Sequence, residues 1–296
     1  MLSYIANFMS VDVDPAGWAR ARETEGWHVL GVADHLWSAR RPFPHVWVTL
    51  ATVAAATQRT LLTSSFANNL LRSPVEFAQA ALSLHAVSGG RFEAGLGAGW
   101  SRDEIIGAAL RYPPPPERAG RYIEAVQIVR SLLHTGSCRW TGEHYDIDVP
   151  ALGPRPSVPP LLVGSLGGPR MIREATPHLD RVELKANSSA TRDGTLDLAK
   201  LGQIPRSHLR EMVDAVRRVR DDVPLGLFVL CSVGDDEFTR QMHSMCDPDG
   251  LFADFFGPAD KVADAVRALE AYGLDRVQIS PFNADAFEAL APLLIE

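Results

Sequence analysis

Short apolar runs alternate with longer amphipathic segments along nearly the whole chain. The apolar runs have the length of buried strands, are rich in branched apolar residues, and end in small or polar residues. The longer segments repeat their apolar side chains every three to four positions, as helices do. This pattern predicts a repeated strand–helix unit. The predicted strands occupy residues 2–8, 29–33, 61–67, 91–96, 161–163, 181–184, 225–233 and 277–280.

Helices are predicted between these strands, at residues 15–26, 46–57, 74–90, 118–134, 170–176, 209–219, 258–272 and 284–295. Residues 113–116 are typical of a stiff proline loop, and residues 138–159 of an excursion without a regular element. Eight strand–helix units with no linker rich in Pro, Gly or Ser favour one α/β domain over residues 1–296. The favoured fold is a closed (β/α)8 TIM barrel with loop insertions. An open, doubly wound parallel sheet is the second possibility.

Composition and charge narrow the classes of function. Hydrophobic residues make up 46% of the chain and charged residues 22%, as in ordinary folded proteins. A formal net charge of -7 without a Lys/Arg cluster argues against a nucleic-acid partner. No apolar run is long enough to span a bilayer, and the first residues carry no basic leader. We therefore expect no membrane partner and a cytoplasmic location. The odd number and wide spacing of Cys138, Cys231 and Cys246 predict reduced structural thiols.

In a barrel of this kind, functional side chains gather at the carboxyl ends of the strands, where the strand–helix loops form one mouth. His35 is the candidate acid or base there, because an imidazole changes its protonation near neutral pH. Asp34 precedes it, and since successive strand residues face opposite sides, we expect only one of the two to point into the mouth. Glu104 is a candidate acid, or else a solvated loop carboxylate. The other strand ends supply residues 65–69, 97–100, 164–168 and 183–185, with Ser232 and Ser280.

Two glycine-rich turns follow predicted strands. The turn Gly164-Ser165-Leu166-Gly167-Gly168-Pro169-Arg170 leads into a helix, so its free N–H groups, the helix dipole and Arg170 would favour a phosphate. It matches neither a P-loop nor a dinucleotide fingerprint, and a simple tight connection is the alternative. Gly97-Ala98-Gly99 would let a flat ring or a phosphate approach the backbone, or would serve only a turn with positive φ.

Taken together, these segments resemble the luciferase-like monooxygenase superfamily, especially its coenzyme F420 (deazaflavin) branch. The most specific piece is SPVEFAQAALSLHAVSGGRF at residues 73–92, running into GLGAGW at residues 95–100. It resembles the family pattern of a proline, a helix ending in Ser-x-Gly-Arg, a strand and Gly-x-Gly-Trp. Supporting pieces lie at residues 25–27, 33–35, 117–124, 142–145 and 160–165.

The resemblance implies a flavin-type cofactor at the barrel mouth. It implies a non-prolyl cis peptide near Ser65-Phe66 behind the ring, the phosphate end held by the two glycine turns, and His35 near the ring. Trp100 is a departure, since several deazaflavin dehydrogenases carry an acid there, and Glu104 is the substitute candidate for proton delivery. The cofactor-binding residues expected on this basis are Asp34, Ser65, Phe66, Ala67, Asn68, Gly97, Ala98, Gly99, Gly164, Ser165, Leu166, Gly167, Gly168 and Arg170.

The function implied by the resemblance is hydride transfer between F420 and a small-molecule organic substrate. An FMN-dependent monooxygenase that activates oxygen, with a reductase partner, is the first alternative. A barrel that binds a flavin-like ligand without catalysis is the second alternative. No metal is expected at the site, and a homodimer is an open possibility.

Overall fold

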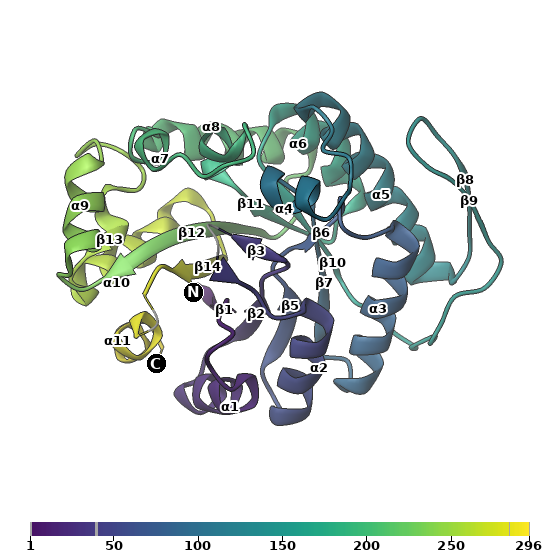
Figure 1. Ribbon diagram of the computed structural model, residues 1–296, viewed down its shortest axis with the longest axis horizontal. Helices are drawn as coiled ribbons and strands as arrows, with labels where there is room; N and C mark the ends of the chain where they lie inside the picture. The colour runs from purple at the N-terminus through teal and green to yellow at the C-terminus, as the bar shows by residue number, and fades with distance from the viewer. Residues whose placement is uncertain (1, 39–40, 284, 296) are drawn as a thin grey trace.

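Eight parallel strands close into a barrel in the computed structural model, which describes residues 2–38, 41–283 and 285–295 (Figure 1). Neighbouring strands pair in parallel all round, and the β10–β7 and β14–β1 pairings complete the ring. The predicted TIM barrel is confirmed, because an open sheet would leave two unpaired edges. The barrel strands are β1 (Ser3–Phe8), β2 (Val29–Val32), β5 (Leu61–Ser64), β7 (Phe92–Gly97), β10 (Leu162–Leu166), β11 (Arg181–Leu184), β12 (Leu225–Val233) and β14 (Arg276–Pro281).

Helices surround the barrel and follow its strands in turn (Figure 1). The first begins where the sequence predicts: Asp14 accepts hydrogen bonds from the Ala16 and Gly17 N–H groups, and Pro15 occupies the first turn. The outer helices are α1 (Pro15–Glu25), α2 (Val46–Ala56), α3 (Pro74–Val87), α5 (Pro115–Thr135), α6 (Pro169–Ala175), α8 (Arg206–Val219), α10 (Ala259–Ala268) and α11 (Ala286–Leu294). Ala284, where the last helix was expected to begin, lies outside the described residues.

Shorter elements fill the loops between strands and helices. Helices of this kind are α4 (Arg102–Gly107), α7 (Leu198–Gly202), α9 (Glu237–Met245) and the 3-10 helices η1 (Thr176–His178), η2 (Ala186–Thr191), η3 (Ala253–Phe255) and η4 (Leu269–Tyr272). Short strands are β3 (Trp37–Ser38), β4 (Arg41–Pro42), β6 (Ala67–Asn68), β8 (Cys138–Thr141), β9 (Asp146–Val149) and β13 (Phe256–Gly257).

Two regions differ from the sequence-based expectation. The prolines at 115 and 116 lie in the first turn of α5 rather than in a loop, because a helix leaves its first N–H groups unpaired and so loses nothing to proline there. Residues 138–149 form the antiparallel hairpin β8–β9, which projects outside the barrel beside α5 (Figure 1). Exposure alternates along both strands, but each strand has only four residues, which is too short a stretch for periodicity to identify.

A buried charged cluster lies among the barrel strands. The Arg276 guanidinium on β14 donates to both oxygens of Glu93 on β7, and it lies 4.0 Å from a Glu183 oxygen on β11. Gly226 makes room for Glu183, because a Cβ at Gly226 would lie 1.9 Å from the Glu183 carboxylate. The cluster neutralises most of its charge internally, as buried charges must. Among the described helices, none is both long enough and apolar enough to cross a membrane.

Candidate active site

His35 and Glu104 meet at the mouth of the barrel although 69 residues separate them. His35 follows β2, and Glu104 lies in the first turn of α4, the helix after β7. The His35 Nδ1 lies 2.8 Å from Glu104 Oε1, and the Leu36 N–H donates to Glu104 Oε2 at 2.8 Å. Glu104 is fully buried, so it is not the solvated carboxylate that the sequence left open. With both its oxygens engaged, Glu104 holds the imidazole in one orientation.

Two aromatic rings flank His35, and a lysine contacts one of them. The Trp100 ring lies edge-on to the His35 ring at 5.6 Å between centroids, and the Phe43 ring lies 5.2 Å from it. The Lys185 ammonium lies 5.4 Å from the Trp100 ring centroid. These rings make the surroundings of His35 apolar, which strengthens the hydrogen bonds within the site.

Asp34 faces another direction from His35. Its carboxylate accepts a pair of hydrogen bonds from the Arg72 guanidinium, at 2.8 and 2.9 Å, and one from the Asn68 N–H at 2.8 Å. A forked arginine pair of this kind fixes both partners. Asp34 therefore positions the segment around Asn68, and His35 alone of the two pairs with Glu104.

The segment after β5 bends across the mouth. The peptide bond between Ser65 and Phe66 is cis, as the resemblance implies. The chain then pairs again as β6, with Ala67 opposite Leu96 and Asn68 opposite Gly97. The buried Ser65 Oγ has no hydrogen-bond partner in the described part of the chain, and neither does Asn7 Oδ1. A Cβ built on Gly31 would lie 3.0 Å from both Asn7 Oδ1 and Ser65 Cβ, so these two side chains are neighbours facing inward.

The turn at residues 97–99 uses its glycines for close packing. Gly99 has a φ of 80°, and a Cβ there would lie 2.3 Å from Asn68 Oδ1. A Cβ at Gly97 would lie 3.1 Å from the Phe66 Cβ. The turn with positive φ thus exists at Gly99, and glycine at both positions lets the bend at Ser65-Phe66 approach β7.

The turn that joins β10 to α6 is shorter than the predicted stretch of residues 164–170. Gly164, Ser165 and Leu166 belong to the strand, and Gly168 begins α6 without a side-chain cap. A Cβ at Gly168 would meet nothing within 4 Å, so the start of the helix is open. Uncapped N–H groups at an open helix start suit an anion. Gly167 is packed instead, since a Cβ there would lie 2.5 Å from the Ser188 Cβ.

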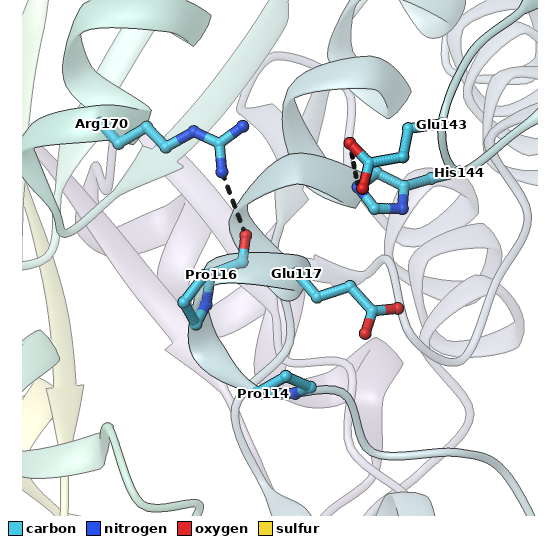
Figure 2. A pocket seen from close by; sticks show the side chains of 6 residues that line it. All are labelled: Pro114, Pro116, Glu117, Glu143, His144 and Arg170. Carbon is cyan, nitrogen blue, oxygen red and sulfur yellow. Dashed lines mark hydrogen bonds and ion pairs between the residues drawn. The ribbon is translucent and has the colours of Figure 1, made fainter.

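Arg170 borders a cavity of about 470 Å³ on the rim beside the mouth. Figure 2 shows its guanidinium reaching the Pro116 carbonyl, with Glu143 and His144 on another wall of the cavity. Arg170 also pairs with Glu174 at 3.1 Å. The cavity therefore joins the start of α5, the start of α6 and the tip of the β8–β9 hairpin.

Lys185 and Arg72 are site residues that sequence reasoning did not single out. The sequence places Lys185 only among the residues at the strand ends, and it gives no reason to select Arg72. Burial lowers the pKa of Lys185 to about 8, and it raises the pKa of Glu183 to about 7 although Arg276 and Arg181 oppose that rise. The only sign of Lys185 in the sequence is its place at the end of a predicted strand. The pairing of Asp34 with Arg72 spans 38 residues and has no local signature.

Comparison with known proteins identifies related sequences. A family model described as luciferase-like monooxygenase matches residues 15–248. An F420-dependent glucose-6-phosphate dehydrogenase of Nakamurella multipartita is 31% identical over 157 residues, covering 51% of this chain and 46% of that protein. The enzyme of the same name from Intrasporangium calvum is 28% identical over 254 residues, covering 76% of this chain and 72% of that protein. The match with the first of these relatives spans about half of that protein's length.

Solved structures share the fold. An F420-dependent secondary alcohol dehydrogenase superposes with a TM-score of 0.73 at 16% identity, covering all of both chains. The F420-dependent tetrahydromethanopterin reductase of Methanopyrus kandleri also gives 0.73 at 16% identity, covering 100% of this chain and 98% of that one. A long-chain alkane monooxygenase gives 0.70 at 13% identity, covering 99% and 91%. At these identities the likeness concerns the fold.

Proposed function

The chain belongs to the luciferase-like monooxygenase family, and from that membership we propose that it is a coenzyme F420-dependent oxidoreductase acting on a small organic substrate. The observation that carries the proposal is the His35–Glu104 pair at the barrel mouth, a proton-handling group held by a buried carboxylate. The relatives found by sequence support F420 as the cofactor, since several are named for it.

The residues at the mouth fit a flavin-type group. The buried Ser65 Oγ and Asn7 Oδ1 have no partner among the described residues, so each can hydrogen-bond a polar ring edge. The residues that would line the ring are Ser65, Phe66, Ala67, Asn68, Gly97, Ala98 and Gly99, with Asp34 behind them. Gly164, Ser165, Leu166, Gly167, Gly168 and Arg170 would hold the phosphate end at the uncapped start of α6.

F420, when bound, supplies the hydride chemistry. The residues of the chain accept or donate the proton that accompanies this transfer. Because Nδ1 of His35 faces Glu104, its Nε2 is the nitrogen left for a substrate. When an alcohol loses hydride from its carbon, the hydroxyl proton passes to Nε2, and the reverse transfer accompanies reduction of a carbonyl. Glu104 stabilises the imidazolium that forms, while Trp100 and Phe43 flank the ring and cover part of it.

A binding titration tests the cofactor assignment. The purified chain would be titrated with F420 and, separately, with FMN, following tryptophan fluorescence. Trp100 lies beside His35, so binding at the mouth should quench it, and Trp100→Phe should lose that part of the signal while keeping the affinity. Micromolar or tighter binding of F420 over FMN is the expected result. No binding of either cofactor would contradict the proposal.

An FMN-dependent monooxygenase with a reductase partner is the second candidate. Trp100 favours it, because it stands where the resemblance to several deazaflavin dehydrogenases implies an acid. A preference for FMN in the titration, together with oxygen consumption that depends on reduced FMN, would establish this function. Tight binding without turnover of any substrate would instead favour a flavin-binding barrel that is not an enzyme.

We further propose that the chain forms a homodimer in the cytoplasm. The exposed face of α2 carries Val48, Ala51 and Ala55 and no charged residue, and Val48 is 66% exposed. An uncharged apolar face of this kind suits burial against a second copy. Light scattering should give the dimer mass, and Val48→Lys should give the monomer. Cys138, Cys231 and Cys246 are buried and unpaired, which suits a reducing compartment, and cell fractionation tests the location.

A further inference from the structure

Lys185 lies at the barrel mouth, and no carboxylate of the described residues pairs with its ammonium. It follows the last residue of β11, and its backbone N–H donates to the Leu166 carbonyl at 2.8 Å. Its ammonium lies 5.4 Å from the Trp100 ring centroid and 5.8 Å from that of Phe228. Within residues 2–38, 41–283 and 285–295, no ion pair or hydrogen bond to this ammonium is formed. The two rings orient the ammonium but do not neutralise it.

Two other largely buried cations of the barrel and its mouth, Arg276 and Arg72, each have a carboxylate partner. Arg276 pairs with Glu93, and Arg72 pairs with Asp34. Glu183 lies two residues before Lys185, yet its ion pairs are with Arg276 and Arg181, each at 4.0 Å. The carboxylate nearest in sequence is therefore turned toward the buried cluster and away from the mouth. An uncompensated ammonium among aromatic rings is costly, which makes an anionic ligand favourable there.

The order of the strands places Lys185 on the opposite side of the barrel mouth from His35. The strand before His35 is β2, and the strand before Lys185 is β11, which lies four strands away round a ring of eight. The two side chains therefore come from opposite walls of the mouth. Trp100 follows β7, between them, and its ring contacts both the His35 ring and the Lys185 ammonium. A small molecule over Trp100 thus meets a proton acceptor at one end and a cation at the other.

We propose that Lys185 binds an anionic group of the substrate, a carboxylate or a phosphate, and so orients the reacting carbon toward His35. The orienting role rests on the proposed function, whereas the binding of an anion at Lys185 does not. The substrate class is then a hydroxy or oxo compound with one anionic end, since His35 handles the proton of the reacting oxygen at the other end. Trp100 and Phe228 provide the apolar contact for the carbon chain between them.

The titration of Lys185 agrees with this assignment. Burial lowers its pKa to about 8, and no neighbouring charge restores it. A bound anion would favour the charged form and raise that pKa. Anion binding should therefore be strongest below pH 8 and weaken as the pH rises through 8, while the pKa of the occupied lysine moves upward.

The chain suits a direct test, because Lys185, Lys200 and Lys261 are its only lysines. Reductive methylation with 13C-formaldehyde keeps the charges and gives each lysine an NMR signal, assigned with Lys185→Met and Lys261→Met. The probes are inorganic phosphate and acetate at millimolar concentration, with sodium chloride at equal ionic strength as the control. Phosphate, acetate or both should raise the titration midpoint of Lys185 by about one unit, equal to tenfold tighter binding to the charged form. Lys261, exposed on α10, should not respond.

Calorimetry of the unmethylated chain gives a second readout. Lys185→Met should abolish phosphate and acetate binding, while Lys261→Met should leave it unchanged. A Lys185 signal that ignores both anions, or that responds equally to chloride, would overturn the proposal. So would a Lys185→Met variant that binds the anions normally but loses F420 affinity, because Lys185 would then belong to the cofactor site. If the anions bind through Lys185 while F420 does not bind at all, the anion site stands and the cofactor assignment fails.

Discussion

At the scale of single residues, Glu104 decides which nitrogen of His35 is available to a ligand. Its buried carboxylate pairs with Nδ1 and is itself held in place by the Leu36 N–H, so the imidazole cannot turn over without losing its contact with Glu104 Oε1. The same carboxylate also stabilises a proton on the ring. Both effects depend on the negative charge of Glu104, so a variant that keeps the shape of the side chain but removes its charge should weaken them.

We expect His35→Gln to lower kcat by about a hundredfold to ten-thousandfold, the usual contribution of a general acid or base. Glu104→Gln should give a smaller loss, and the double variant should be little worse than His35→Gln because the two act as one unit. F420 absorbance during turnover measures the rates, with Asp103→Asn, the exposed neighbouring acid on α4, as the control. Additive losses would refute the coupling, and an unchanged rate in His35→Gln would remove its role.

Because of Glu183, we expect the free energy of unfolding to depend on pH. Burial raises its pKa from 4.5 to about 7, despite the attraction of Arg276 and Arg181. Between these values the folded chain binds more protons than the unfolded chain, so the free energy of unfolding falls as the pH rises through this window. The full loss is roughly 3 kcal/mol. Urea unfolding at several pH values should show this slope in the wild type and in Glu143→Gln, an exposed control, but a weaker one in Glu183→Gln. Parallel curves for all three would contradict the assignment.

The site could be predicted in parts from the sequence. His35 and the two glycine turns lie where strands end, which periodicity and turn chemistry indicate, and Glu104 follows shortly after β7. Their pairings could not be predicted, since the His35–Glu104 contact spans 69 residues and depends on how α4 folds back over the mouth. Lys185 was overlooked for a physical reason: a lysine is ordinarily solvated, and nothing local indicates that Trp100 and Phe228 will cover it.

At the scale of elements, strands and helices were predicted well where one face or both faces are buried. β11 and β12 have the predicted bounds, and Lys185 and Gly234 follow their last residues. The prediction was weakest outside the barrel, at the β8–β9 hairpin, whose strands are only four residues long and only partly buried. The tip of that hairpin is hydrogen-bonded to one side chain of α5, Glu124.

Glu124 on α5 accepts hydrogen bonds from the backbone N–H groups of residues 143, 144 and 145 and from the Trp140 indole, at 2.9 to 3.2 Å. Glu124→Ala should release the hairpin tip, at a local cost of about 2 kcal/mol for hydrogen bonds to a charged group. Hydrogen exchange at residues 140–145 should accelerate accordingly, with Glu143→Ala, whose side chain is 83% exposed, as the control. Unchanged protection in Glu124→Ala would show that other contacts hold the hairpin.

At the scale of the whole molecule, the closed ring of strands determines how the chain should lose its structure. β1 pairs with β2 on one side and with β14 on the other, so the first and last strands of the ring depend on each other. The β7–β10 pairing links the two halves of the chain in the same way. No barrel strand can leave the ring without breaking two ladders, and on this ground we propose that the chain forms one domain.

We therefore expect one cooperative unfolding transition, with far-UV and near-UV circular dichroism changing together and a calorimetric enthalpy equal to the van't Hoff value. F420 at a hundred times its dissociation constant should move the whole transition upward, since such binding adds about 2.7 kcal/mol to the folded state. Glu124→Ala should leave the transition single, because the hairpin lies outside the ring. Two separated transitions, only one of them moved by F420, would show that the halves of the barrel fold independently and that the cofactor contacts only one of them.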